Sequence, residues 1–303
     1  MFSKGLACFL SGAKNRRVSG GVDLIESQYE PSLGKEAPLR DMRAVEASLP
    51  FVREKMRSFE AYGKAGLAEI YGEALKKMRE LSANTLASTI FFNRGDHFEA
   101  RALPRDAQFA PAFGISVADM DGDGNEDIFL AQNFFAANQD TDRCDAGRGL
   151  WLRGDGRGGL QVVPGQESGI KVYGEQRGCA VSDFDGDGRI DLAVTQNANQ
   201  TKLYHNVGAK PGLRVRLNGT AQNPSAVGAS MRLIFGERSG PVREIHAGSG
   251  YWSQDSSVQV LAIPEAPTQL WVRWPGGKIT TTPLSPSAHE ITIDQTGTLQ
   301  ATK

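Results

Sequence analysis

The chain has 303 residues, with 34 basic and 35 acidic side chains, and its net charge of −1 gives no reason to expect a nucleic-acid partner. No stretch approaches the roughly eighteen consecutive apolar residues of a membrane span, which excludes a transmembrane helix. Hydrophobic residues make up 40%, as in globular domains, and 35 glycines favour many tight turns between short strands. We therefore expect a mainly β protein.

The N-terminal part falls into two segments. Residues 1–37 carry no pattern that assigns them a structure, and the apolar stretch Gly5 to Ala13 is too short and too polar for a secretory signal. In residues 38–86 apolar side chains recur at spacings of three and four between charged ones, which is the helical period. Pro50 stands where one helix ends and another begins, so we expect two to four short helices.

From residue 87 to residue 210 the helical period is replaced by strand-like runs between Gly, Asn and Asp clusters. Gly114 to Asn133 aligns with Gly178 to Asn197 at an offset of 64 residues. Such self-similarity predicts a repeat architecture, in which each unit stacks on its neighbours. Part of a third unit is visible in three similar strand-and-turn segments, which are FFNRGDHF (91–98), WLRGDGRGGL (151–160) and LYHNVG (203–208). We therefore count about two and a half units.

Each full copy contains the motif D-x-D-G-D-G-x-x-D, and the two windows carry formal charges of −5 and −3. Crowded carboxylates repel one another, and a hard divalent cation offsets that repulsion. A calcium loop supplies side-chain oxygens at positions 1, 3, 5 and 9 and a backbone carbonyl at position 7, which here is Asn125 or Arg189. We predict two Ca²⁺ ions, held by Asp119, Asp121, Asp123, Asn125 and Asp127 in one loop and by Asp183, Asp185, Asp187, Arg189 and Asp191 in the other.

These loops are not EF-hands, because position 12 holds Leu130 or Val194 instead of Glu and both loops run into β-type sequence. The unit G-x-x-V-x-D-x-D-G-D-G-x-x-D, followed by Q-N and L-Y-x-N, resembles the FG-GAP or VCBS repeat of extracellular β-propellers. The resemblance covers residues 87–208 and implies that calcium braces each blade. By itself it implies neither signalling nor catalysis.

Residues 211–303 resemble the ASPIC/UnbV domain, which follows such repeats in the cartilage acidic protein family and its bacterial relatives. The matching pieces are Gly228-Ala229, Gly248 to Gln254, and Trp274-Pro275-Gly276-Gly277. After the pair Ser253-Gln254, where the sequence reads VQVLAIPEAP, the chain departs from the family's usual pattern. A propeller closes with about four to eight blades, so two and a half units are too few to close one. The chain therefore resembles the C-terminal portion of a longer protein, and we expect its partner to be a second copy of the chain or the missing blades.

These features together predict a calcium-binding, non-enzymatic protein of the extracellular space, the periplasm or the cell envelope, with a protein or glycan partner. No nucleophile motif occurs, and the four His residues have no partner at ligand spacing. Two alternatives stay open. One is a glycan-active enzyme that uses the same Asp residues. The other is a lectin-like module in which Tyr251 and the four tryptophans stack on a sugar. We otherwise expect these tryptophans in the cores between strands; they are Trp151, Trp252, Trp271 and Trp274.

Two Arg-Gly-Asp tripeptides begin at Arg94 and Arg153, at equivalent places in two units. Hairpin turns require Gly and Asp there, so we interpret both tripeptides as turns and not as adhesion sequences. Cys144 and Cys179 lie in adjacent repeats, where they either pair as a disulfide or remain buried thiols.

Overall fold

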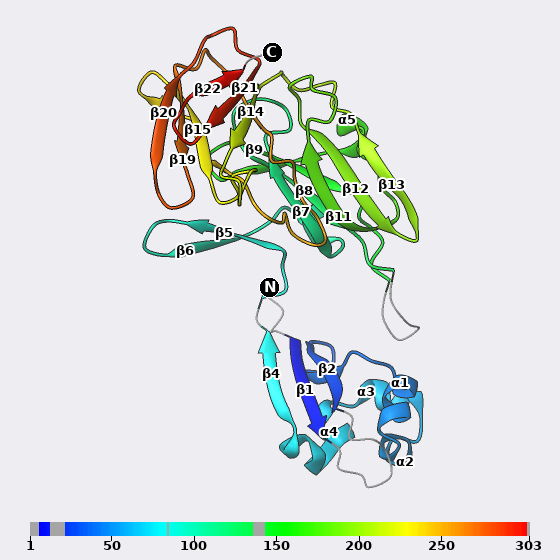
Figure 1. Ribbon diagram of the computed structural model, residues 1–303. Helices are drawn as coiled ribbons and strands as arrows, with labels where there is room; N and C mark the ends of the chain where they lie inside the picture. Colours follow the sequence, from blue (N-terminus) through cyan, green and yellow to red (C-terminus); the bar gives the residue numbers. More distant parts are fainter. Residues whose placement is uncertain (1–5, 13–21, 84, 136–142, 302–303) are drawn as a thin grey trace. The chain divides into compact units, whose positions relative to one another are not determined.

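The computed structural model describes residues 6–12, 22–83, 85–135 and 143–301. The described residues fall into two compact units, one up to residue 87 (unit 1) and one from residue 88 onward (unit 2). Both units contain antiparallel sheets, and helices are few and short (Figure 1). The expectation of a mainly β protein is confirmed.

Unit 1 combines a four-stranded antiparallel sheet with short helices. The sheet has the order β3-β2-β1-β4, formed by β1 (Leu6–Gly12), β2 (Val22–Glu30), β3 (Lys35–Pro38) and β4 (Arg79–Ala83). The helices are α1 (Met42–Ser48), α2 (Phe51–Lys55), α3 (Phe59–Lys64), α4 (Leu67–Tyr71) and the 3₁₀ helix η1 (Gly72–Lys77). Val52 and Ile70 are completely buried in the core that the helices share with β2.

Local signals in the sequence explain where these helices start. The side chain of Asp41 accepts a hydrogen bond of 2.9 Å from the amide of Ala44 at the start of α1, and Ser58 does the same for Ala61 at the start of α3. Pro50 separates α1 from α2, as the sequence predicts. The two to four expected helices are therefore present.

The expected helical segment differs from the structure at its end. Residues 79–83 form strand β4 and pair with β1 in an unbroken antiparallel register, instead of continuing the helical pattern through residue 86. Residues 1–37, which the sequence left unassigned, include β1, β2 and most of β3. Pairing between segments about 70 residues apart supplies backbone hydrogen bonds that no local period reveals.

The repeats of unit 2 (residues 89–204) form three sheets. The hairpin of β5 (Thr89–Asn93) and β6 (Phe98–Ala102) comes first and is followed by the short helix η2 (Arg105–Gln108). A four-stranded sheet follows with the order β10-β9-β8-β7, formed by β7 (Ala112–Ala118), β8 (Asp127–Gln132), β9 (Leu150–Gly154) and β10 (Leu160–Val163). After helix α5 (Gly165–Ser168), a three-stranded sheet has β11 (Glu175–Ser182), β12 (Asp191–Asn197) and β13 (Asn199–Tyr204).

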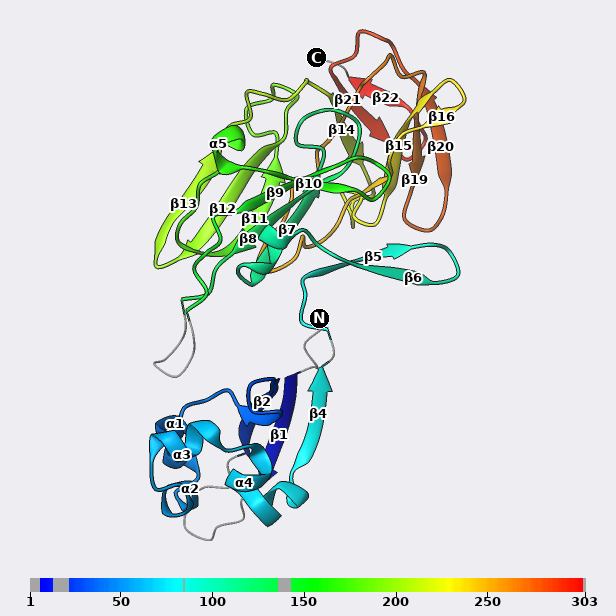
Figure 2. The same ribbon diagram turned by 180° about the vertical axis from the view of Figure 1, so that it is seen from behind.

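Strands β7 and β11, the first of each repeat, pack on one another as neighbouring blades of a propeller do (Figures 1 and 2). The repeated glycine makes this approach possible. A Cβ atom on Gly114 would lie 2.8 Å from the carbonyl oxygen of Arg177 and 2.9 Å from the amide of Cys179. A Cβ atom on Gly178, its equivalent, would lie 2.7 Å from the Oγ atom of Ser253. The segment around Ser253 therefore packs on β11 of the second repeat, in the place where β11 packs on β7 of the first.

Residues 213–301 form a C-terminal β-domain of two sheets. One has the order β18-β14-β21-β22, in which β14 and β21 are parallel, and the other has the order β16-β15-β19-β20 with β17 beside β15. The strands are β14 (Leu213–Asn218), β15 (Ser230–Phe235), β16 (Arg238–Ser239), β17 (Arg243–Glu244), β18 (Gln259–Leu261), β19 (Gln269–Arg273), β20 (Ile279–Pro283), β21 (Glu290–Asp294) and β22 (Leu299–Ala301).

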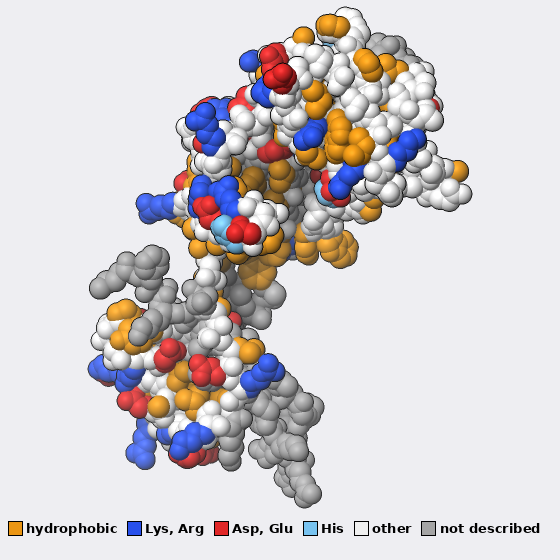
Figure 3. Space-filling model, turned by 90° about the vertical axis from the view of Figure 1, so that its left-hand side faces the viewer, with side chains coloured by type: hydrophobic (Ala, Val, Ile, Leu, Met, Phe, Trp, Pro, Cys, Tyr) orange, Lys and Arg blue, Asp and Glu red, His pale blue; other side chains and the backbone are white. Residues whose placement is uncertain are grey.

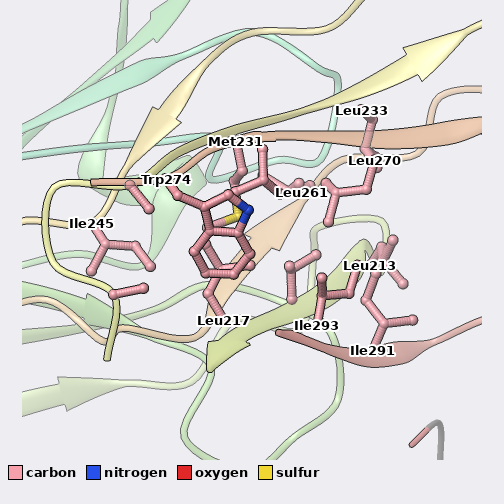
Figure 4. Close-up of a cluster of buried hydrophobic side chains, with 14 of the residues drawn as sticks. Leu213, Leu217, Met231, Leu233, Ile245, Leu261, Leu270, Trp274, Ile291 and Ile293 are labelled. Carbon is pink, nitrogen blue, oxygen red and sulfur yellow. The ribbon is translucent and has the colours of Figure 1, made fainter. Parts of the chain in front are cut away.

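Alternating apolar residues of these strands point between the two sheets and form the largest core of the chain's described part. Trp274, with 2% of its surface exposed, lies at the centre of this cluster, beside Met231 and Leu217 (Figure 4). Burial of such a side chain contributes about 1.5–3 kcal/mol relative to exposure. This core thus fixes the strands of the C-terminal β-domain, including those that contact the repeats.

In the described part of the chain, no helix has the length and apolar character needed to cross a bilayer. Acidic and basic side chains are interspersed on the face that Figure 3 shows, so neither sign dominates there, in keeping with the net charge of −1.

Candidate functional site

Both Asp motifs lie in hairpin loops whose ends are held together by strand pairing. In the first loop (residues 119–127), Ala118 at the end of β7 pairs with Asp127 at the start of β8. In the second loop (residues 183–191), Ser182 of β11 pairs with Asp191 of β12 in the same way. The first and last carboxylates of each motif are therefore brought together by the sheet.

The glycines of the motif have backbone conformations that other residues rarely adopt. Gly122 and Gly124 have φ angles of 73° and 95°, and Gly186 and Gly188 both have φ of 83°. A Cβ atom on Gly122 would also lie 2.5 Å from the carbonyl oxygen of Lys210. The repeated glycines thus turn each loop inward on its carboxylates.

The first Asp of each motif is held by backbone amides. In Asp119, Oδ1 accepts hydrogen bonds from the amides of Gly122 (2.8 Å) and Asp123 (3.1 Å), and Oδ2 accepts one from Gly124 (2.8 Å). The second loop repeats this pattern around Asp183, with bonds of 2.8, 3.1 and 2.8 Å from Gly186, Asp187 and Gly188, respectively. The two loops are therefore folded alike.

The last Asp of each motif ties its loop to the neighbouring chain. Asp127 accepts hydrogen bonds from the amides of Met120 (3.0 Å) and Gly154 (2.8 Å), the latter at the end of β9. Asp191 accepts the equivalent bonds from Phe184 (3.1 Å) and Asn206 (2.8 Å). Asp127 and Asp191 are nearly inaccessible to solvent, so their oxygens are fixed in position.

Three carboxylates converge in each loop. Asp119, Asp121 and Asp127 each offer an oxygen within 4.8 Å of the others, and Asp183, Asp185 and Asp191 do the same in the second loop. Positions 1, 3 and 9 of the motif therefore come together in both copies.

The remaining predicted ligands are placed less uniformly. The Oδ1 atom of Asp123 accepts a hydrogen bond of 2.7 Å from the amide of Asn125, and Asp187 accepts one of 2.9 Å from Arg189. Asp187 also forms a group with Asp185 and His205 whose ligand atoms lie within 4.8 Å of one another. Among the residues that the structure describes, Asp123 joins no such three-residue group. The carbonyl ligands expected from Asn125 and Arg189 stay predictions.

Three carboxyl groups of the first loop, those of Asp119, Glu126 and Asp127, have raised pKa values. Burial raises the pKa of Asp119 despite its three amide donors, and burial raises the pKa of Asp127 to about 6. Burial also raises the pKa of Glu126, which lies next to Asp127. Each of these groups is more costly to ionise than an exposed carboxyl, and a bound cation removes that cost.

Basic side chains lie beside the carboxylates of both loops, three of them at the second loop. The guanidinium of Arg214 on β14 forms an ion pair with Asp183, and the Nε2 atom of His205 lies 2.9 Å from an oxygen of Asp185. Burial acts to raise the pKa of Asp187, but the hydrogen bonds and charge of Arg189 lower it on balance. In the first loop, Arg153 lies with its Nε atom 2.7 Å from the Oδ2 atom of Asp121.

Sequence reasoning missed these basic partners. It gave His205 no partner at ligand spacing, and this was wrong, because the fold places the residue beside a loop that ends 14 residues earlier. No local pattern signals Arg214, which is 31 residues from Asp183. Only the L-Y-x-N repeat around His205 pointed to its position.

The second Arg-Gly-Asp tripeptide is used within the fold. Arg153 contacts Asp121, Gly154 donates its amide to Asp127, and Asp155 accepts hydrogen bonds from Arg157 (2.7 Å) and Gly159 (2.8 Å) in the β9–β10 turn. The first tripeptide lies in the β5–β6 turn, where Arg94 pairs with Glu99 at 2.8 Å. Both are turns, as the sequence predicts.

The donor set of both loops fits a calcium ion. It consists of oxygen atoms of carboxylates, which a hard cation prefers, on loops with glycines at the turning positions. Asp119, Asp121 and Asp127 would hold one ion, and Asp183, Asp185 and Asp191 the other. The ion would supply positive charge that compensates the crowded carboxylates and cross-links the hairpin.

The structure answers two questions from the sequence, which are whether the tryptophans lie in strand cores and whether Cys144 and Cys179 pair. Trp274 is buried in the C-terminal core, whereas Trp252, with 90% of its surface exposed and a φ of 49°, departs from the expected core role. The thiol of Cys179 is free, so this residue does not form the disulfide with Cys144 that the sequence left open.

Comparison with known proteins identifies the C-terminal part. Residues 219–300 match the family model of ASPIC and UnbV. Over 126 residues, the chain is 30% identical to cartilage acidic protein 1 of Xenopus tropicalis, a match that covers 40% of this chain and 19% of that protein. The chain thus spans about a fifth of the length of this relative. The match to the ASPIC and UnbV family takes in most of the C-terminal β-domain.

Proposed function

We propose that this chain is a calcium-binding, non-enzymatic repeat protein of the FG-GAP/VCBS type, in which one Ca²⁺ ion in each Asp loop braces the repeats against the C-terminal β-domain. The observation that carries this proposal is the equivalence of the two loops. Two segments 64 residues apart have the same amide hydrogen bonds, and in both the carboxylates at positions 1, 3 and 9 of the motif lie close together. Selection for an ion site in each repeat accounts for this agreement.

The position of the loops supports a bracing role. The amide of Lys210 donates a hydrogen bond of 3.2 Å to the carbonyl oxygen of Asp121, and the amide of Gly212 donates one of 2.7 Å to that of Gly188. Residues 210 and 212 lead directly into β14, so both loops contact the start of the C-terminal β-domain. An ion in either loop therefore stabilises the junction between the repeats and this domain.

The burial of the carboxylates supports a structural role over a catalytic one. Asp127 and Asp191 each accept two backbone hydrogen bonds while nearly inaccessible, which leaves them poorly placed to reach a substrate. An extracellular or cell-envelope location is supported by the name of the relative, cartilage acidic protein 1. A protein or a glycan is the partner we propose.

Calorimetric titration of metal-free protein with CaCl₂ tests the proposal. Two ions should bind at calcium concentrations up to about 1 mM, the range of extracellular calcium modules. Asp121→Asn and Asp185→Asn should each remove one site, and the double variant should bind none. Asp155→Asn, which alters a turn carboxylate outside both loops, serves as the matched control and should retain both sites. A wild-type protein without calcium uptake contradicts the proposal.

A further inference from the structure

The second loop carries a positive group from another part of the fold at its first ligand. Arg214 of β14 donates through Nη1 to the Oδ2 atom of Asp183, and through the same nitrogen to the Asp183 carbonyl oxygen at 3.3 Å. The side chains of Arg214 and Asp183 are only 14% and 1% exposed. The guanidinium carbon would lie 3.9 Å from a Cβ atom on Gly186, so the group sits against the loop itself.

The first loop has no such group at the equivalent position. Within the described part of the chain, Asp119 accepts hydrogen bonds from backbone amides and takes part in no ion pair. Its neighbouring cations are Arg153, which lies at the third position of the motif, Asp121, but is 36% exposed, and Arg243, which lies at Glu126. The two loops are therefore alike in backbone, but only the second has a largely buried guanidinium at its first ligand.

A guanidinium and a calcium ion compete for the first Asp of the second loop. The Oδ2 atom of Asp183 already accepts two hydrogen bonds, from Gly188 and Arg214, which occupy the lone pairs that a metal ion needs. Two positive charges at one carboxylate also repel each other, and burial strengthens that repulsion. Arg214 has another partner, because its Nε atom donates to Glu290 at 3.1 Å. It can therefore release Asp183 without becoming an unpaired buried charge.

We infer that Arg214 is a built-in counter-cation that makes the second loop the weaker calcium site and couples its filling to the contact between this loop and β14. This inference rests on the proposed calcium binding and goes beyond it, since it assigns different affinities to two loops of the same motif. The first loop binds calcium at low concentration. The second loop fills only when calcium displaces the Arg214 guanidinium from Asp183.

Calcium titrations of wild type, Arg214→Gln, Arg214→Lys and Arg216→Gln test the inference. Arg216 is an exposed residue of the same strand, so its substitution removes the same charge without touching Asp183. Wild type should show two dissociation constants at least about tenfold apart, with the weak site lost in Asp185→Asn and the strong site lost in Asp121→Asn. Arg214→Gln should tighten the weak site about tenfold and leave the strong one unchanged. Arg214→Lys, which keeps the charge, and Arg216→Gln should stay close to wild type.

The outcomes separate this inference from the proposed function. Equal dissociation constants in wild type, or a weak site that Arg214→Gln leaves unchanged, overturn the inference while calcium binding stands. A protein that binds calcium at neither loop overturns both. If Arg214→Gln does not fold, two measurements still test the inference. They are the ratio of the two dissociation constants in wild type and the dissociation constant of the weak site in Arg214→Lys. A weak site that Arg214→Lys tightens as much as tenfold contradicts a role for the charge.

Discussion

The Nη2 atom of Arg243, on β17, lies 2.8 Å from the Oε2 atom of Glu126, at the end of the first loop. Both carboxylate oxygens of Glu126 are inaccessible to solvent and accept no hydrogen bond within the described part of the chain, so this ion pair is what compensates their charge. Burial raises the pKa of Glu126, and the charge of Arg243 opposes that rise. The pair joins the first loop to the C-terminal β-domain through a desolvated contact.

Arg243→Met should therefore destabilise unit 2 by about 2–3 kcal/mol, because it leaves a buried carboxylate without its counter-charge. Urea unfolding of the calcium-free protein measures the change. Arg143→Met is the matched control, since Arg143 pairs with Asp145 at 2.7 Å but is 57% exposed, and its loss should cost no more than about 0.5 kcal/mol. Equal effects of the two substitutions would contradict a role for burial.

Gly114→Ala should destabilise unit 2 by about 1–3 kcal/mol, because the added Cβ atom meets backbone atoms of β11 that cannot move aside. The φ of Gly114 is not in the left-handed region, so the cost is steric and not conformational. Gly208→Ala is the control, since a Cβ atom there meets nothing within 4 Å. Thermal unfolding of both variants is the measurement, and an unchanged midpoint in Gly114→Ala argues against close packing of β7 on β11.

The metal-free protein should lose stability as the pH rises from about 4 to about 6. Burial raises the pKa of Asp127 to about 6, whereas an unfolded Asp titrates near 3.9. In this window the folded state holds a proton that the unfolded state has released, so stability falls with rising pH, and the loss is nearly complete at about pH 7. This group accounts for at most about 3 kcal/mol.

Urea unfolding in the presence of a chelator, compared between wild type and Asp127→Asn, isolates that contribution. The difference in stability between the two proteins should vary between pH 4 and pH 6 and level off at pH 7. A difference in stability between the two proteins that stays constant with pH is the contrary result.

At pH 7, free calcium at a hundred times its dissociation constant should add about 2.7 kcal/mol per filled site to the free energy of unfolding.

The thiol of Cys179 should react slowly in the native protein. Its side chain is buried beside Ser116, and burial raises its pKa to about 11. At pH 8 only about one molecule in a thousand then carries a thiolate. In a variant that retains Cys179 as its single thiol, labelling by a disulfide reagent should be at least about 100-fold slower than in urea. A variant that retains the half-buried Cys144 should label faster, and rapid native labelling of Cys179 would place it outside the core.

Local chemistry in the sequence determined the two Asp loops. The spacing of Asp119, Asp121 and Asp127 and the intervening glycines act within nine residues, so their turn geometry follows from the motif itself. The repeat at an offset of 64 residues likewise predicted paired strands around each loop, and β7–β8 and β11–β12 are those pairs. Helices α1 and α3 followed from the apolar period, and the caps at Asp41 and Ser58 fix where they start.

Only the tertiary structure decided which charges meet these loops and which strands complete unit 1. Arg214 and Arg243 reach Asp183 and Glu126 from 31 and 117 residues away, and β4 pairs with β1 across the whole of unit 1. The two arginine contacts arise because the core around Trp274 fixes the strands of the C-terminal β-domain that carry Arg214 and Arg243. Periodicity records which face of a strand is buried, but it carries no information on which distant side chain lies opposite a given carboxylate.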